Sequence, residues 1–244
     1  DIMRELRPVS SMLAKSVQNV LKQRKRNATE KGLYMGSRLD SSSYYRADGR
    51  VFTKRNLPSD NIDMSVAILV DESGSMCGDR IANAQAMALI VYDFCSQLNI
   101  PVTIYGHNYG YDGVDLYSFA EFDSIDGNDK YRLMNMNAYN CNRDGCAVRY
   151  VAEKLCKRFE TMRMFIVVSD GQPSADSYCG TAAEQDLQSI RKEYERKGIT
   201  FYAAAIGDDK ECIRRCYGEK AFLDLTDLKK FPMTIAKLIA RNAI

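Results

Sequence analysis

Three oxygen-bearing side chains alternate directly after an apolar stretch of the sequence. Residues 66–70 read Val-Ala-Ile-Leu-Val, and Asp71, Ser73 and Ser75 follow at every second position. A continuous apolar run over 65–70 is typical of a central parallel strand, so one carboxylate and two hydroxyls are expected at its carboxyl end. Hard oxygen donors of this kind suit a small divalent cation such as Mg²⁺. The competing interpretation is a polar turn that caps the next helix, since Ser and Asp favour turns and N-caps.

A second strand end carries the same kind of residues. Residues 163–168 predict another buried strand, and Ser169, Asp170 and Gly171 follow it. In open parallel sheets, ligands bind outside the carboxyl ends of the strands, at the point where the strand order reverses. Asp71 and Asp170 both fall at such a position. Two strand ends with Asp favour the metal interpretation over a single polar turn.

The elements that would hold these residues alternate between strands and helices from Asp63 onward. The pattern predicts strands over 65–70, 101–105, 114–122, 163–168, 200–206 and 221–225. It predicts helices over 80–98, 145–159, 182–197 and 227–242. Strands separated by helices of this length imply a three-layer α/β fold, with a mainly parallel sheet and helices on both faces. We therefore expect one α/β domain over residues 63–244.

The first part of the chain differs in charge from the rest. Residues 1–60 contain 13 Lys or Arg and 6 Asp or Glu, a net charge of +7. Of the 34 basic and 32 acidic residues in the chain, this leaves 21 and 26, a net of −5. Residues 10–27 predict an amphipathic helix, and residues 34–62 are rich in turn residues. We expect residues 1–62 to form a basic helix and an arm that wraps the body.

Composition excludes several classes of protein. The 244 residues suffice for one large domain, and no apolar run approaches the roughly 18 residues of a membrane span. The eight cysteines include no C-x-x-C pair, and the chain has a single His, which excludes a Cys₂His₂ zinc site. The sequence opens without an apolar leader, so we expect no signal peptide in it. It also opens without an initiator Met, so we expect it to be a piece of a longer protein. We expect a cytoplasmic protein with reduced thiols.

Taken together, the two strand ends resemble the von Willebrand factor A (VWA) domain. Asp71-x-Ser73-x-Ser75 and Ser169-Asp170-Gly171 have the order and strand context of the first and third loops of that family's metal-ion-dependent adhesion site (MIDAS). The resemblance implies a bound Mg²⁺, or alternatively Mn²⁺ or Ca²⁺. It also implies a partner protein that supplies an Asp or Glu to the ion.

The second loop of this sequence departs from the family pattern, which has a Thr there. Counting back five residues from Ala147 gives Asn142, whose amide oxygen is a candidate ligand. Asp144 is the competing donor, although just before Gly145 it also suits a helix N-cap. The flanking residues that we expect to contact the partner protein are Glu72, Met76, Arg143, Gly171 and Gln172.

Several segments resemble one intracellular bacterial group of VWA proteins. They are the loop at 141–145, the strand end at 163–173 and the closing stretch at 204–208. The group contains the nitric oxide reductase activation protein and a cobalt-chelatase subunit. The resemblance implies a chaperone-like role beside a MoxR-type AAA+ ATPase. Because the chain has no Walker A motif, that ATPase would be a separate polypeptide.

Catalysis and nucleic-acid binding are the alternatives. No Ser-His-Asp arrangement is evident in the sequence, and a lone ion with mostly neutral ligands has no general base beside it. We therefore predict a non-catalytic binding module over a metal-assisted hydrolase, and a structural role for His107. The basic arm, with Tyr44, Tyr45 and Phe52, would suit nucleic acid through phosphate neutralisation. We favour docking on an acidic protein.

Overall fold

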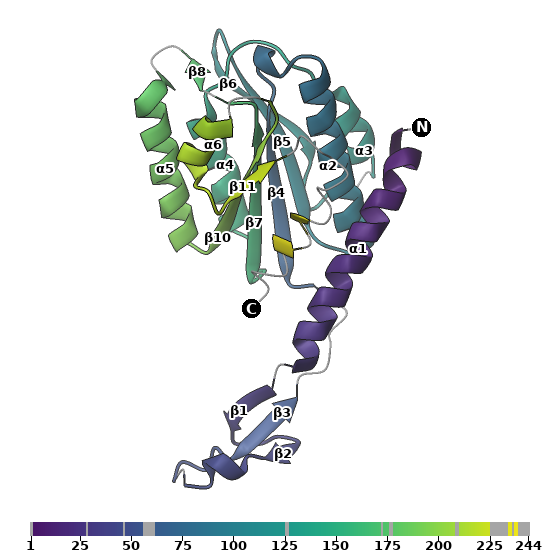
Figure 1. The fold of residues 1–244 in the computed structure, drawn as a ribbon, viewed down its shortest axis with the longest axis vertical. Coiled ribbons are helices and arrows are strands. Elements are labelled where there is room, and N and C mark those ends of the chain that lie inside the picture. The colour runs from purple at the N-terminus through teal and green to yellow at the C-terminus, as the bar shows by residue number, and fades with distance from the viewer. Residues whose placement is uncertain are drawn as a thin grey trace.

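A six-stranded sheet forms the centre of the body (Figure 1). The computed structural model describes residues 2–27, 29–45, 47–55, 62–124, 127–171, 173–175, 178–207, 210–224, 234–235 and 237–238. The strands are β4 (Met64–Asp71), β5 (Val102–Gly110), β6 (Gly113–Ala120), β7 (Met162–Ser169), β10 (Ile199–Ala205) and β11 (Phe222–Asp224). Their order is β11-β10-β7-β4-β5-β6, and only the β5–β6 pair is antiparallel. The predicted mainly parallel sheet is therefore confirmed, with β6 as its antiparallel edge.

Helices cover both faces of this sheet, which gives the predicted three layers. On one side lie α1 (Ile2–Asn27), α2 (Asp79–Gln97) and the short α3 (Asp129–Arg132); on the other lie α4 (Asp144–Cys156), α5 (Gly180–Arg196) and α6 (Lys210–Tyr217) (Figure 1). The helices expected over 80–98, 145–159 and 182–197 are confirmed as α2, α4 and α5. The sequence reading missed α3 and α6. Most of the helix expected over 227–242 lies outside the described residues.

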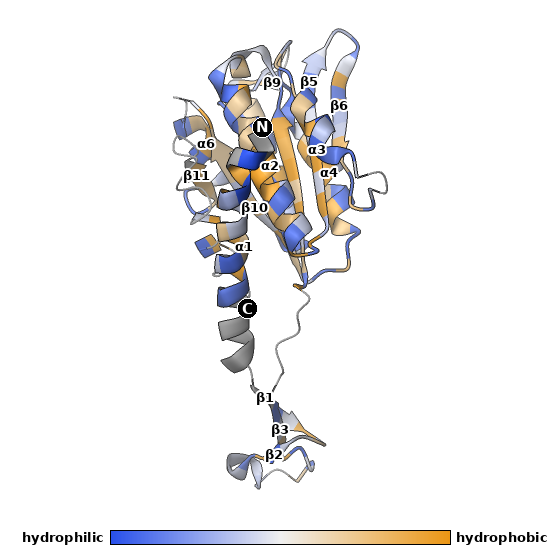
Figure 2. Ribbon diagram, turned by 90° about the vertical axis from the view of Figure 1, so that its right-hand side faces the viewer, coloured by the Kyte–Doolittle hydropathy of each residue, from blue (hydrophilic) through white to orange (hydrophobic). Residues whose placement is uncertain are grey.

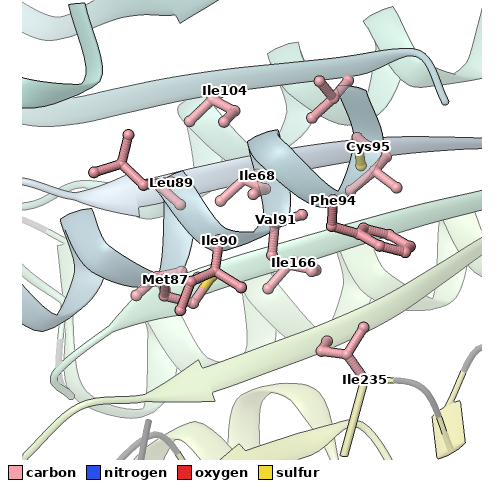
Figure 3. Close-up of a cluster of buried hydrophobic side chains, with 14 of the residues drawn as sticks. Ile68, Met87, Leu89, Ile90, Val91, Phe94, Cys95, Ile104, Ile166 and Ile235 are labelled. Atoms are coloured by element: carbon pink, nitrogen blue, oxygen red, sulfur yellow. The ribbon is translucent and has the colours of Figure 1, made fainter. Parts of the chain in front are cut away.

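The buried strand β4 divides the core in two because successive side chains of a strand point to opposite faces. Val66, Ile68 and Val70 join the cluster under α2, and Ala67 and Leu69 join the cluster under α4. Figure 3 shows Met87, Val91 and Phe94 of α2 in one buried cluster with Ile68, Ile104 and Ile166 of three neighbouring strands. Burial on both sides holds the carboxyl end of β4 firmly in place.

The helix α1 is longer than the sequence predicts, starting eight residues earlier and containing Pro8. Leu13, Ala14 and Val17 are buried in the core on the α2 side. The remaining face of α1 is polar, as Figure 2 shows by its blue colour. The amphipathic pattern thus attaches the basic segment to the body through one apolar stripe.

Beyond α1, the chain forms a small antiparallel sheet rather than an arm wrapped around the body. Its strands are β1 (Thr29–Leu33), β2 (Arg38–Leu39) and β3 (Phe52–Arg55), in the order β1-β3-β2. Figures 1 and 2 show this sheet past the far end of α1, apart from the body. Tyr34, Met35, Leu39, Tyr44 and Tyr45 are exposed on it. Local strand pairing, which the turn-rich composition obscured, replaces the expected contact with the body.

No helix in the described ranges combines the length and apolarity that crossing a bilayer requires.

The register of the parallel strands determines which residues meet at their carboxyl ends. Val70 of β4 lies opposite Val168 of β7, and Asp71 lies opposite His107 of β5. The residues that follow β4 and β7 therefore emerge beside each other. β4 lies between β7 and β5 in the sheet. The chain continues from β4 into α2 on one face of the sheet, and from β7 toward α5 on the other.

Candidate metal centre

Asp71 is the most enclosed carboxylate at this end of the sheet. Its side chain is buried, and its Oδ1 accepts a hydrogen bond from the Ser73 backbone N–H at 2.8 Å. Its Oδ2 accepts from Asn142 Nδ2 and from Ser169 Oγ, both at 3.0 Å. Residues from three separate loops thus contact one carboxylate. Charged acceptors form the stronger class of hydrogen bond, so these donors fix its orientation.

A chain of oxygens runs from the first loop to Asp170. Ser73 Oγ lies 3.0 Å from Ser75 Oγ, and Ser75 Oγ donates to Asp170 Oδ1 at 3.0 Å. Asp71, Ser73 and Asp170 are buried, whereas Ser75 is exposed. The structure therefore brings together the five oxygen-bearing residues of the two predicted strand ends, including Ser169, with solvent access at Ser75.

The first loop is held at both ends. A short 3₁₀ helix over Gly74–Met76 follows Ser73, and the Gly74 N–H donates to the Asn140 carbonyl at 2.8 Å. Met76 is fully buried in the core under α2, which anchors the far end. Gly78 then has φ 82, a left-handed conformation that favours glycine. These constraints hold the hydroxyls of Ser73 and Ser75 next to each other at the same edge of the sheet.

Asn142 lies between the first loop and Ser174, and its amide has a defined orientation. Its Oδ1 accepts from the Ser174 backbone N–H at 2.8 Å and from Ser174 Oγ at 3.0 Å. A backbone N–H is always a donor, so this contact identifies the oxygen side of the amide. The amide nitrogen consequently faces Asp71. Asn142 orients the Asp71 carboxylate in this arrangement, and its oxygen is engaged with Ser174.

Asp144 is also buried, and it lies beside the single histidine. It is the first residue of α4, so the N-cap position expected for it belongs to Arg143, and its Oδ1 lies 3.4 Å from His107 Nε2. Burial, followed by the charge of Asp71, raises the pKa of Asp144 well above its ordinary value. Burial lowers the pKa of His107. Both shifts favour the uncharged forms, and His107 faces the interior of the protein.

The two strand-end carboxylates concentrate negative charge at the site. Burial raises the pKa of Asp170, and the nearby charge of Asp71 adds to the effect. Arg80, in the first turn of α2, opposes it through an ion pair in which Nη1 lies 2.8 Å from Asp170 Oδ2. Burial thus favours the protonated form of Asp170, whereas the ion pair with Arg80 favours the ionised form.

The residues expected to contact a partner differ in accessibility. Glu72 and Met76 are buried, so their side chains are not available to a docked protein in this structure, and Gly171 is buried as well. Glu72 packs over Gly106, its Oε1 accepts from the Asn137 N–H at 3.2 Å, and burial raises its pKa to about 7. Gln172 lies outside the described residues.

Arg143 is the predicted partner contact that remains near the surface. Its side chain is half-buried, and its guanidinium lies 5.9 Å from the Tyr109 ring centre and 5.5 Å from that of Tyr178. Two aromatic faces thus flank one cation directly after Asn142. A cation so placed is suited to bind a carboxylate that approaches the site.

The donor chemistry fits a hard cation. Across the described ranges, no group of three or more His, Cys, Asp or Glu side chains forms a metal cluster. The convergent set consists of two carboxylates and two hydroxyls, from Asp71, Asp170, Ser73 and Ser75. Mg²⁺ favours such oxygen donors and retains waters at its remaining positions, whereas zinc sites favour nitrogen and sulfur. Sequence reasoning missed Arg80, Ser174 and the bond from Ser169 to Asp71.

Two sequence comparisons relate the chain to known proteins. Residues 128–240 match the family model of the VWA domain of the cobalamin biosynthesis protein CobT. The protein YojO of Bacillus subtilis (strain 168) is 28% identical over 142 residues, covering 53% of this chain and 21% of YojO. This chain therefore corresponds to about a fifth of that relative's length. Asn142 and Asp170 lie within the family match, and Asp71 precedes it.

Solved structures with the same fold include two bacterial pilus proteins. The PilB minor pilin of Streptococcus sanguinis has a TM-score of 0.56 and 14% identity, covering 82% of this chain and 67% of that one. The VWA domain of the type V pili tip protein Mfa5 from Porphyromonas gingivalis has a TM-score of 0.56 and 10% identity, covering 75% and 97%. Together with the sheet topology, these matches show that the body has the VWA fold.

Proposed function

We propose that this VWA domain is a protein-interaction module that depends on a divalent cation. Asp71, Ser73, Ser75 and Asp170 would hold the ion, Mg²⁺ in the first instance. The observation that carries the proposal is the continuous chain of short contacts from Ser73 through Ser75 to Asp170, beside the carboxylate of Asp71. These oxygens belong to two strand ends that the fold brings together, and their chemistry is that of a hard-cation site.

The bound ion would supply a positive charge with an exchangeable coordination position, which a carboxylate of the partner would fill. The residues of this chain prepare that position. Asn142 and Ser169 keep the Asp71 carboxylate oriented, and Arg143 offers a second positive charge between two tyrosine rings. An Asp or Glu of a partner protein would thus meet two cationic groups, and charge-assisted contacts of this kind are the stronger ones.

We further propose that the partner is a MoxR-type AAA+ ATPase and that the pair acts in a chaperone-like system in the bacterial cytoplasm. The match to the CobT VWA domain supports this assignment, because that family is named for cobalamin biosynthesis. Within this system the domain would bind rather than catalyse. His107 supports a binding role, since it faces Asp144 in the interior.

Surface plasmon resonance with a purified MoxR-type AAA+ ATPase tests the proposal. The immobilised VWA chain is expected to bind that ATPase in Mg²⁺ and to lose binding in EDTA. Asp71→Ala is expected to lose binding in both conditions while the circular dichroism spectrum is unchanged. Arg132→Gln, which removes a charge from a separate ion pair on α3, is the matched control. Binding that persists in EDTA would contradict the metal-dependent mode.

A further inference from the structure

Arg80 lies at the junction of three elements around the candidate metal centre. Its Nη1 donates to Asp170 Oδ2 at 2.8 Å and to the Ser75 carbonyl at 3.1 Å. Gly207, at the end of β10, has φ +118, and a Cβ there would lie 3.4 Å from Arg80 Cζ. The guanidinium thus contacts the first loop and the third loop, and it packs against a glycine of a further strand end.

The charges at the site show what this contact does. The Arg80 side chain is 39% exposed, whereas that of Asp170 is 6% exposed, so the ion pair lies at the border between solvent and interior. The two negative charges of Asp71 and Asp170 balance the two positive charges of a divalent cation. Without Arg80, an ion held between them would give a neutral centre. With Arg80 paired to Asp170, the loaded centre retains one positive charge.

We propose that Arg80 sets the net charge of the loaded site, so that the site binds its ion less tightly but binds a carboxylate more tightly. The inference rests on the proposed function, since it concerns the same metal centre. Asp170 has one oxygen bonded to Ser75 and the other bonded to Arg80. Arg80 therefore offsets the charge of Asp170 while the Ser75 side of the carboxylate still faces the chain of oxygens.

A purely structural role for Arg80 makes the opposite prediction for the ion. Arg80 ties the Ser75 carbonyl to Asp170, so its loss would loosen the first loop and weaken both ion and carboxylate binding. A role in setting charge makes the two affinities change in opposite directions. Repulsion between the guanidinium and the cation falls away when the charge is removed, and so does attraction for the incoming carboxylate.

The experiment uses Mn²⁺ as the ion and acetate as the carboxylate, with the full chain. Water-proton relaxation reports Mn²⁺ binding, and its decrease on adding acetate reports displacement of water from the bound ion. Arg80→Gln is expected to lower the Kd for Mn²⁺ on the order of tenfold and to raise the Kd for acetate by a similar factor. Arg80→Lys keeps the charge and is expected to stay within about twofold of the unmodified chain for both ligands.

Arg132→Gln provides a matched control. Arg132 lies 2.7 Å from Asp129, and their side chains are 43% and 3% exposed, close to the values for Arg80 and Asp170. This variant removes the same charge from a similar ion pair on α3 and is expected to change neither affinity. Arg80→Met, which retains the apolar stem of the side chain, serves as a second uncharged variant should Arg80→Gln fail to fold.

The outcomes separate this inference from the proposed function. An unmodified chain that binds no Mn²⁺ would overturn the metal-dependent function itself. Mn²⁺ binding by the unmodified chain that is unchanged or weakened in the uncharged Arg80 variants would overturn the role of Arg80 alone. Tighter Mn²⁺ together with weaker acetate in those variants, and neither change in Arg132→Gln, supports the inference.

Discussion

The Ser75 hydroxyl donates to Asp170 Oδ1 at 3.0 Å, a bond between residues 95 positions apart in the chain. Ser75 belongs to the loop after β4, and Asp170 follows β7, the strand beside it in the sheet. This bond closes the chain of oxygens that begins at Ser73. It depends on the parallel register of two central strands, and so the site and the fold share one geometric basis.

Removing the Ser75 hydroxyl is expected to affect ion binding far more than folding. Ser75 is exposed, so Ser75→Ala should change the free energy of unfolding by less than about 1 kcal/mol. The same change removes a proposed ligand and the bond to Asp170, and we expect it to raise the Kd for Mg²⁺ at least about tenfold. Isothermal titration with MgCl₂ and urea denaturation measure the two quantities. Ser16→Ala, at a half-buried serine of α1 whose hydroxyl donates to the Met12 carbonyl, is the control; equal Kd values for the two variants would argue against a Ser75 ligand.

Asn142→Ala is expected to weaken both the fold and the site. Asn142 is 1% exposed and joins Asp71 to Ser174, so its loss leaves buried groups without partners, at a cost of about 1–3 kcal/mol in the free energy of unfolding. Groups that orient a metal ligand typically change metal affinity about 10–100-fold. Ser174→Ala leaves the backbone bond to Asn142 in place and should have a smaller effect on both measurements. An Asn142→Ala variant with full Mg²⁺ affinity would show that Asp71 needs no such orientation.

Gly106→Ala tests the packing beneath the first loop. A Cβ at Gly106 would lie 2.6 Å from Glu72 Cδ and 2.8 Å from a ring carbon of Phe119, so Glu72 has to move. We expect a loss of about 1–3 kcal/mol in the free energy of unfolding, as for other overpacked sites. Gly110→Ala, in the same strand, would meet the side-chain ends of Asp115 at 3.1 Å and Asn140 at 3.5 Å, which can give way. Similar denaturation midpoints for the two variants would mean that Glu72 is not confined there.

The ion pair before β7 should make stability depend on pH. Arg158 donates to both carboxylate oxygens of Glu160, at 2.6 and 3.1 Å, and this contact lowers the pKa of Glu160. Because the pKa is lower in the folded state, the stabilisation is present above the unfolded-state pKa and is lost as the pH falls through the folded-state value. Glu160→Gln should therefore cost about 1 kcal/mol at pH 7 and close to nothing in acid. A difference between the two chains that is the same at pH 7 and at pH 3, measured by urea denaturation, would contradict this origin.

The strand ends could be predicted because their signals are local. Apolar runs before Asp71 and before Ser169 predict buried strands, and parallel strands align their carboxyl ends. The neighbouring positions of the two strand ends follow from that alignment, whereas the 3.0 Å bond from the Ser169 hydroxyl to the Asp71 carboxylate was not predicted.

The roles within the loops could not be predicted in the same way. The direction of the Asn142 amide depends on Ser174, which reaches it from a loop 32 positions further along the chain. The burial of Glu72 depends on the space that Gly106 leaves in a neighbouring strand. Arg80 acts through a side chain that reaches back from α2 to Asp170. Each of these is a tertiary contact with no periodic pattern in the sequence.

Crystals of the full chain grown with MnCl₂ test the central claim most directly, through an anomalous difference map at the manganese edge. The account predicts one strong peak at the carboxyl end of the sheet, among the oxygens of Asp71, Ser73, Ser75 and Asp170, and its absence from Asp71→Ala crystals. A map with no peak there, or a peak that persists in the Asp71→Ala protein, would contradict it.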